Sequence, residues 1–140
     1  MIYVLDTNVL AEVMKPTPSV AVATWMRAQS PRSLFTASIC QAEILAGVAV
    51  LPTGRRRAEF EAMARDIFTR EFDGRILPFD TKAASAYADI FATRRQMGRP
   101  IETADLIVAA TARAHDAAVV TRDSGGFEGC GVTLVKPWDA

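Results

Sequence analysis

Four acidic residues stand where a carboxylate could do chemistry, either just after an apolar strand-like run or within an apolar helical pattern: Asp6, Glu43, Asp105 and Asp123. Asp6 follows the run Ile2–Leu5, and Asp123 follows the apolar segment 117–121. In open parallel sheets ligands bind at the carboxyl ends of the strands, so we expect both acids at that edge. The alternative for Asp6 is that it only caps a helix or turns the chain.

Glu43 falls inside a predicted helix and Asp105 lies near the start of another, rather than at a strand end. The residues three and four positions from Glu43 are all small or apolar: Ile39, Cys40, Ala46 and Gly47. We therefore expect the Glu43 carboxylate to lie on a packed face, where a charge is costly unless it is paired or binds a metal. Asp105 has Val108 and Ala109 on its face. Its alternative role is that of a first-turn acid favoured by the helix dipole.

Acids gathered at one site raise each other's pKa unless a cation lies between them. Ligands that are all oxygen suit a hard cation, Mg²⁺ or Mn²⁺, which activates water and stabilises charge on a phosphate. We predict that Asp6, Asp105 and Asp123 hold such an ion directly, and that Glu43 is a ligand, through water or not, or orients the nucleophile. Polar residues beside these acids would orient them: Thr7, Asn8 and Thr121.

Composition limits the remaining possibilities. The chain has 140 residues, which suits one domain over residues 1–140, and 16 basic residues balance 16 acidic ones. A net charge of zero argues against a general nucleic-acid coat, so any RNA contact must be local. Cys40 and Cys130 have no metal-type spacing and are expected to be buried thiols. With no signal peptide and no apolar run long enough to span a membrane, we expect a cytoplasmic protein.

The elements that must position the acids follow from the apolar pattern. Strands are predicted at 2–5, 33–37, 76–79, 117–121 and 132–135. Helices are predicted at 8–14, 19–28, 38–50, 55–72, from Asp80 to Gly98, and over 106–112. Ser38 and Asp80 are expected to cap their helices, and Ala84, Tyr87 and Phe91 are expected to face inward. The alternation predicts an α/β fold with a parallel sheet and helices on both of its faces.

Two basic clusters end or begin helices. Arg55–Arg57 opens one predicted helix, and Arg94, Arg95 and Arg99 close another. Cations near a helix end are usually solvated. Cations at a helix start oppose the helix dipole, and this slightly favours a phosphate-binding role for Arg55–Arg57.

The four acidic motifs, taken in order, resemble those of the PIN-domain ribonucleases, and within them the VapC-like toxins of bacterial toxin–antitoxin pairs. The matching segments are Leu5-Asp6-Thr7-Asn8, the run 42–47, the run 104–110, and Thr121-Arg122-Asp123 through 127–129. The resemblance implies a PIN-like fold, which is a three-layer α/β/α sandwich with a mainly parallel sheet. It also implies cleavage of RNA that leaves a 5′-phosphate, a homodimer, and inhibition by a cognate antitoxin protein. One common family pattern has asparagine where Asp123 stands and an acid where Gly126 stands; other members place the acid at the first position, so we assign the fourth carboxylate to Asp123.

Two other functions compete with this interpretation. A catalytically impaired PIN fold would only bind RNA or a protein partner, and the irregular last motif keeps that alternative open. A phosphatase of the haloacid-dehalogenase type would use Asp6 as its nucleophile. That chemistry requires a second aspartate at the position of Asn8, and no catalytic lysine is evident.

Overall fold

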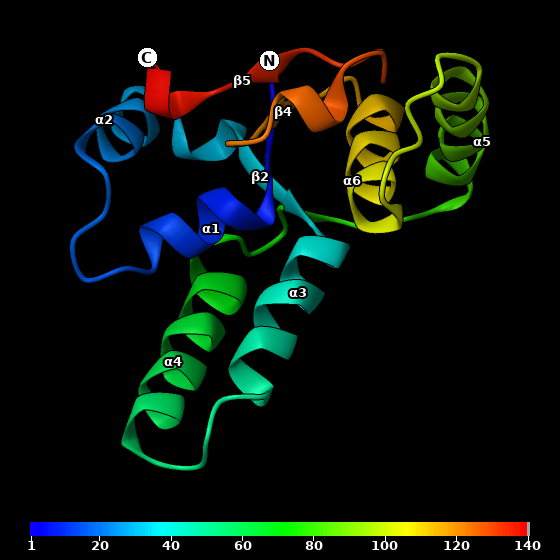
Figure 1. Cartoon of the computed structure of the whole chain (residues 1–140). Coiled ribbons are helices and arrows are strands. Elements are labelled where there is room, and N and C mark those ends of the chain that lie inside the picture. Colours follow the sequence, from blue (N-terminus) through cyan, green and yellow to red (C-terminus); the bar gives the residue numbers. More distant parts are fainter. Residues whose placement is uncertain (140) are drawn as a thin grey trace.

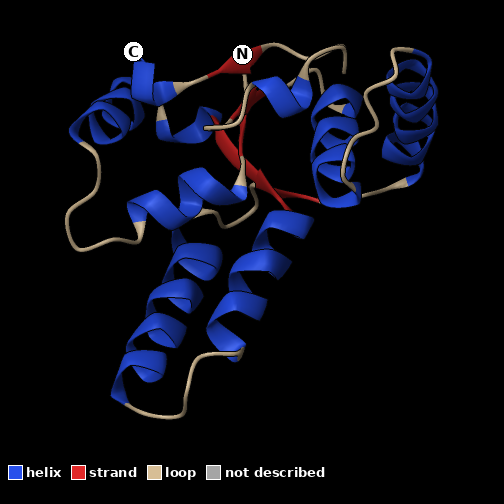
Figure 2. Ribbon diagram, in the orientation of Figure 1, coloured by secondary structure: helices blue, strands red, loops and turns tan. Residues whose placement is uncertain are grey.

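A five-stranded parallel sheet forms the centre of the computed structural model, which describes residues 1–139 (Figure 2). The strand order is β3-β2-β1-β4-β5. The strands are short: β1 (Tyr3–Leu5), β2 (Leu34–Ala37), β3 (Ile76–Leu77), β4 (Ala118–Val120) and β5 (Leu134–Val135). Leu5 is in register with Thr36 on one side and with Val120 on the other, so β1 lies in the middle of the sheet. The predicted α/β class and parallel sheet are confirmed.

Helices cover both faces of this sheet and also extend beyond it. They are α1 (Thr7–Val13), α2 (Val20–Ala28), α3 (Ser38–Ala49), α4 (Arg55–Asp66), α5 (Thr81–Gln96) and α6 (Thr103–Ala114). Figure 1 shows α1 and α2 on one side of the sheet and α5 and α6 on the other, while α3 and α4 project as a pair past the carboxyl ends of the strands. The result is the predicted three-layer arrangement.

The core lies where the central strands meet α6. Val4 and Leu5 of β1 and Val119 and Val120 of β4 are fully buried, as central strands of a parallel sheet should be. In α6, the buried side chains are mostly small, which lets the helix approach the sheet closely: Leu106, Val108, Ala109, Ala110, Thr111 and Ala112. This helix carries Asp105 in its first turn.

Two helix boundaries differ from the predicted ones. Ser38 is the first residue of α3 rather than its cap; Ala37 takes the cap position, with no side-chain hydrogen bond. The helix predicted over 55–72 ends as an α-helix at Asp66 and continues as a π-helical turn, Ile67–Glu71, before the buried Phe72. Asp80 does cap α5, because its Oδ1 accepts a hydrogen bond of 2.9 Å from the Ala83 amide.

The face that α5 turns inward was predicted wrongly. The buried side chains are Ala83, Ala86, Ile90 and Arg94, whereas Ala84 and Phe91 are exposed and Tyr87 is half-buried. Both faces of this helix are apolar, so the periodicity alone did not distinguish them. The small side chains of Ala83 and Ala86 permit close packing on the alanine-rich α6, whereas Phe91 would hold the two helices apart.

Two further sequence-based expectations concern cysteines and membranes. Cys40 and Cys130 are both buried free thiols, as predicted. Within residues 1–139, every helix falls short of the length and apolar character that a membrane crossing demands.

Candidate active site

Asp6 directly follows Leu5, the last residue of β1, and so lies at the carboxyl end of the central strand of the sheet. Its backbone amide continues the strand pairing by donating to the Val120 carbonyl oxygen at 2.9 Å. Its carboxylate accepts 2.8 Å hydrogen bonds at both oxygens, from the Thr7 amide at Oδ1 and from the Thr121 hydroxyl at Oδ2. Only 5% of the residue is exposed. Asp6 is therefore the N-cap residue of α1, and it is also a buried carboxylate held in one orientation.

The buried hydroxyl of Thr121 joins three parts of this edge. While its Oγ1 donates to Asp6, it accepts from Asn8 Nδ2 at 3.2 Å and from the Asp123 amide at 3.1 Å. The Asn8 Oδ1 in turn accepts from the Arg122 amide at 3.1 Å. The ends of β1 and β4 are thus tied together through side chains that the sequence analysis assigned to orienting the acids.

Glu43 reaches the same edge from the first half of α3. The Thr7 hydroxyl donates to Glu43 Oε1 at 2.6 Å, so Thr7 lies between Asp6 and Glu43. The expectation that Glu43 is on a packed face is wrong, since both Glu43 and its neighbours Ala46 and Gly47 are exposed. The reason is that α3 leaves the sheet at this edge, so its small residues there are not covered by the core.

Asp105 approaches from the start of α6 and is half-buried. Burial raises the pKa of Asp105 to about 6, with further contributions from the negative charges of Asp6, Glu102, Asp123 and Glu43. Burial likewise raises the pKa of Asp6, with smaller contributions from Glu43 and Asp123, while its hydrogen bonds to Thr121 and Thr7 oppose the shift. The four predicted acids therefore lie within electrostatic reach of one another. Glu102 is a fifth nearby carboxylate that the sequence analysis missed, although it stands three residues before Asp105.

Asp123 is exposed in the loop after β4, and its Oδ1 accepts a 3.1 Å hydrogen bond from the Gly126 amide. A Cβ atom added at Gly126 would lie 2.8 Å from Asp123 Oδ2. A side chain at position 126 would therefore enter the space that the Asp123 carboxylate occupies. Glu128 does not compete for this place, because it forms a 2.6 Å ion pair with Arg99 that lowers the pKa of Glu128.

Arg94 organises this loop from the end of α5, and its role was missed in the sequence. It was predicted to belong to a solvated cluster, but it is only 4% exposed. Its Nη1 donates to the carbonyl oxygens of Gly126 and Glu128, each at 2.8 Å, and its Nε donates to that of Arg99 at 2.6 Å. Its burial could have been predicted from its position, because Arg94 stands four residues after Ile90 on the buried face of α5.

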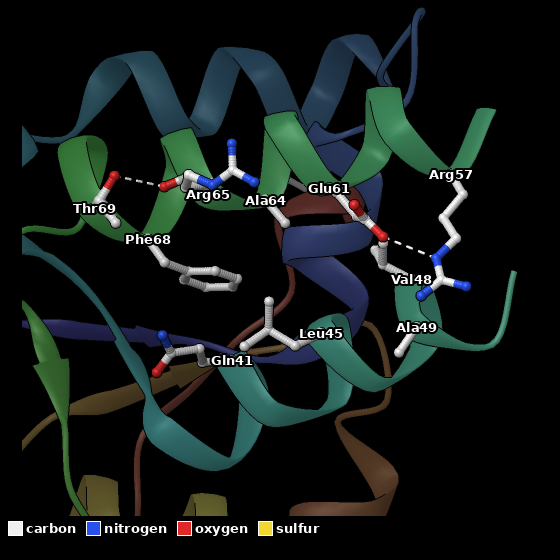
Figure 3. A pocket seen from close by; sticks show the side chains of 10 residues that line it. All are labelled: Gln41, Leu45, Val48, Ala49, Arg57, Glu61, Ala64, Arg65, Phe68 and Thr69. Atoms are coloured by element: carbon white, nitrogen blue, oxygen red, sulfur yellow. Dashed lines mark hydrogen bonds and ion pairs between the residues drawn. The ribbon is translucent and has the colours of Figure 1, made fainter. Parts of the chain in front are cut away.

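The other arginine cluster, Arg55–Arg57, is solvated, as most clusters of cations near a helix end are. Arg55 and Arg57 form i,i+4 ion pairs within α4, at 3.2 and 2.8 Å, and the Arg56 guanidinium lies over the Phe60 ring at 5.7 Å. Arg57 also lines a cavity of about 370 Å³ between α3 and α4, into which Leu45 and Phe68 project (Figure 3). None of the four candidate acids lines this cavity. A smaller groove of about 230 Å³, bounded by α1, α3 and α4, does include Glu43.

The oxygen atoms of the four candidate acids are chemically suited to a hard divalent cation. The four acids provide only oxygen donors, and the raised pKa values of Asp6 and Asp105 reflect in part negative charge that a cation would neutralise. Their side chains are not drawn together, however: within residues 1–139, no three His, Cys, Asp or Glu side chains are arranged closely enough to hold a metal ion.

Comparison with known proteins identifies the family. Residues 3–129 match the model of the PIN domain family. The chain is 40% identical over 136 residues to the VapC ribonuclease Y4jK of Sinorhizobium fredii, covering 97% of each chain. It is 36% identical to toxin FitB of Neisseria gonorrhoeae, covering 96% of each. The structure of FitAB bound to an IR36 DNA fragment has a TM-score of 0.92 at 35% identity, covering 98% of this chain and 96% of that one. The chain therefore belongs to the PIN-domain family.

Proposed function

We propose that this protein is a metal-dependent endoribonuclease that cleaves RNA phosphodiester bonds and acts as the toxin of a toxin–antitoxin pair. The observation that supports this most is that carboxylates from four separate segments of the chain influence one another electrostatically near one sheet edge, where Asp6 and Asp105 have raised pKa values. Such an arrangement is unfavourable without a cation, and family relatives are named as a ribonuclease and a toxin.

In this proposal Asp6, Asp105 and Asp123 would hold Mg²⁺ or Mn²⁺, and Glu43 would be a further ligand, directly or through water, or would orient the attacking water. The ion, when bound, lowers the pKa of water and stabilises negative charge on the phosphate. The chain's own contribution is orientation. Thr121 and the Thr7 amide fix both oxygens of Asp6, and the Thr7 hydroxyl fixes Glu43. Water attack with the 3′ oxygen as leaving group gives a 5′-phosphate product.

The partners in the proposal are an RNA substrate, a cognate antitoxin and a second copy of this chain in a homodimer, with residues 1–140 as one nuclease domain acting in the cytoplasm. Solved relatives include the complexes FitAB and FitAcB, the latter with a TM-score of 0.89 at 33% identity. We expect the antitoxin to place an arginine at the carboxylates, because a guanidinium pairs with them as a cation would.

The test is cleavage of a structured RNA by the purified chain with Mg²⁺, with Mn²⁺ and with excess EDTA. Cleavage should require either ion, stop with the chelator, and leave 5′-phosphate ends. Full RNA cleavage in excess EDTA would contradict a metal-dependent mechanism. In the host, expression of the wild type should slow growth and expression of Asp6→Asn should not; equal growth of the two would exclude the toxin role.

A second candidate is a catalytically impaired PIN fold that binds RNA or a protein. The observation that favours it is the separation of the carboxylates among residues 1–139, together with the exposed Asp123. A catalytically impaired protein would bind RNA in a filter-binding assay and would not cleave it with Mg²⁺ or Mn²⁺. The endoribonuclease predicts cleavage under the same conditions.

A further inference from the structure

A basic residue stands between two residues of the candidate site. Arg122 follows Thr121, whose hydroxyl donates to Asp6, and it precedes Asp123. The amide of Arg122 donates to Asn8 Oδ1 at 3.1 Å, so the backbone at this position is tied to the segment that follows β1. The Arg122 side chain is exposed. It is therefore a solvent-accessible cation held at the sheet edge that carries the candidate acids.

The aromatic ring of Trp138 supports the guanidinium of Arg122, whose Cζ atom lies 5.1 Å from the centre of the ring. Strand pairing explains this contact, because Val120 of β4 is in register with Val135 of β5. Arg122 and Trp138 follow these two residues closely in the chain. An arginine stacked on an aromatic face keeps N–H donors for a further partner. The ring thus restricts the side chain without neutralising its charge.

The acidic residue that Arg122 influences is already occupied by other groups. The Ser19 amide and Lys15 lower the pKa of Glu12, with a smaller contribution from Arg122. Lys15 Nζ lies 3.0 Å from Glu12 Oε1, and the Ser19 amide donates to Oε2 at 2.9 Å. Within residues 1–139, no ion pair joins Arg122 to a carboxylate. The charge of Arg122 can therefore pair with a group that the chain does not supply.

The segments that carry the four candidate acids contain few cations. Over residues 3–14, 38–49, 103–114 and 118–131, the basic residues are Arg113 and Arg122. Arg113 is in the last turn of α6, whereas Asp105 is in the first. Eight residues of helix separate the two by about 12 Å, which exceeds the distance of about 10 Å over which exposed charges interact in 0.1 M salt. Arg122 is therefore the cation of these segments that can act beside the acids.

The chemistry of this position suits a phosphate group of RNA. Four carboxylates outweigh the two positive charges of one divalent ion, so the site remains acidic, yet the proposed substrate carries a negative charge at every phosphate. A guanidinium offers paired N–H donors that match phosphate oxygens. Contacts of this kind position a nucleic-acid strand and carry no sequence information. Arg122 has the charge, the exposure and the place for such a contact.

We propose that Arg122, held over Trp138, binds a phosphate of the RNA strand next to the phosphate that is cleaved. The inference rests on the proposed function and adds a residue that positions the substrate. Arg122 would neither hold the metal ion nor take part in breaking the bond. Its removal should therefore weaken RNA binding and raise KM, with kcat nearly unchanged.

The first experiment measures binding of a short fluorescein-labelled single-stranded RNA by fluorescence anisotropy, in EDTA and at about 50 to 200 mM NaCl. Arg122→Gln should bind about three- to tenfold more weakly. The slope of log Kd against log salt concentration should fall by about 0.7, the value for one phosphate contact to a single strand. Arg122→Lys keeps the charge and should keep the wild-type slope. Arg113→Gln is the matched control and should bind like the wild type, because Arg113 is exposed and distant from the acids.

The second experiment separates substrate binding from a structural role in the loop. With Mg²⁺ and an RNA that the wild type cleaves, Arg122→Gln should raise KM about three- to tenfold and leave kcat nearly unchanged. Calorimetric titration should show that Mn²⁺ binds Arg122→Gln as tightly as the wild type, since no ligand has been removed. An unchanged circular dichroism spectrum verifies the fold of the variant.

Three outcomes would overturn the proposal. A wild type that binds no RNA, or Arg122→Gln with the wild-type affinity and slope, would exclude the phosphate contact. Equal losses of affinity in Arg122→Lys and Arg122→Gln, with unchanged slopes, would show that the contact with Trp138 is only structural. Weaker Mn²⁺ binding in Arg122→Gln would show that Arg122 positions Asp123 instead. The anisotropy experiment includes no cleavage, so a wild type that binds RNA without cleaving it would remove the endoribonuclease proposal and leave this test decisive.

Discussion

At the scale of single residues, Asp6 caps a helix and also presents the carboxylate that we propose as a metal ligand. It is the N-cap residue of α1 through the Thr7 amide, and its second oxygen is held by Thr121 at the site. The capping role does not compete with metal binding, because a carboxylate oxygen can accept from a donor and still ligate. The neighbours of the four acids in sequence made them candidates, but the same argument was wrong about the burial of Glu43, because its exposure depends on where α3 leaves the sheet.

Substituting the coupled acids should stabilise the metal-free protein. In Asp105→Asn the repulsion from Asp6, Glu102, Asp123 and Glu43 disappears, and the amide retains the shape of the side chain. We expect the Tm at pH 7 without metal to rise by about 2–4 °C, the shift that ~1 kcal/mol causes in a protein of this size. RNA cleavage should fall at least about tenfold. Differential scanning calorimetry measures the first effect, and a drop in Tm would show that Asp105 is needed mainly for its place in the helix turn.

The raised pKa of Asp105 predicts the direction of the pH dependence. Its folded-state pKa of about 6 exceeds the ordinary value of 3.8, so the folded state binds this proton more tightly than the unfolded state does. The stabilisation from this group is fully present below about pH 4 and is lost as the pH rises through 6. In the metal-free protein the wild type should therefore lose stability relative to Asp105→Asn between about pH 4 and pH 7. Parallel urea titrations of the two proteins test this, and a constant difference across the range would contradict it.

Position 123 offers a test of the least regular motif. Asp123→Asn should cut the cleavage rate at least about tenfold, as losing a charged ligand or its orienting partner typically does, whereas Glu128→Gln should change little because Glu128 pairs with Arg99. Gly126→Asp should restore activity in the Asp123→Asn background. The restored acid has to displace the asparagine side chain at position 123, because the Cβ of residue 126 comes within 2.8 Å of the position of Asp123 Oδ2. A fully active Asp123→Asn with an inactive Glu128→Gln would reverse the assignment.

At the scale of elements, the loop after β4 depends on α5. Arg94 is a buried cation that donates to three backbone carbonyl oxygens, and Arg99 adds a 3.1 Å bond to the Gly125 carbonyl oxygen. The sequence predicted α5 as a helix and Asp80 as its cap, since capping and apolar spacing are local signals. It did not predict which face turns inward, because that choice is made by the fit of Ala83 and Ala86 to α6.

Removing the Arg94 side chain should loosen the loop. Arg94→Met keeps most of the apolar stem but leaves the carbonyl oxygens of Gly126 and Glu128 without their donor, which costs about 1–3 kcal/mol each when the group stays buried. We expect faster hydrogen exchange over residues 123–130 and lower cleavage, with little change in β1. Arg95→Met is the matched control, because Arg95 is the exposed neighbour. Equal exchange in both variants would contradict the positioning role.

At the scale of the whole molecule, the fold brings together four segments separated by up to 117 positions in the chain, from Asp6 to Asp123. The parallel sheet could be predicted because strands and helices alternate, and a parallel sheet places its strand ends at one edge. The strand order could not be predicted, since short apolar strands carry no signal for their neighbours. The meeting of Asp6 and Asp123 follows from the pairing of β1 with β4. Glu43 lies near Asp6 because β2 is the other neighbour of β1 and leads directly into α3, which carries Glu43.

The proposal that these acids form one metal site is tested most directly by calorimetric titration of Mn²⁺ into the purified chain. We expect a saturable site in the wild type whose affinity falls at least about tenfold in each of Asp6→Asn, Asp105→Asn and Asp123→Asn. Glu128→Gln, which removes a carboxylate of the same loop that is paired with Arg99, should bind like the wild type. Absence of Mn²⁺ binding in the wild type, or equal affinity in all four variants, would contradict a metal site shared by these acids.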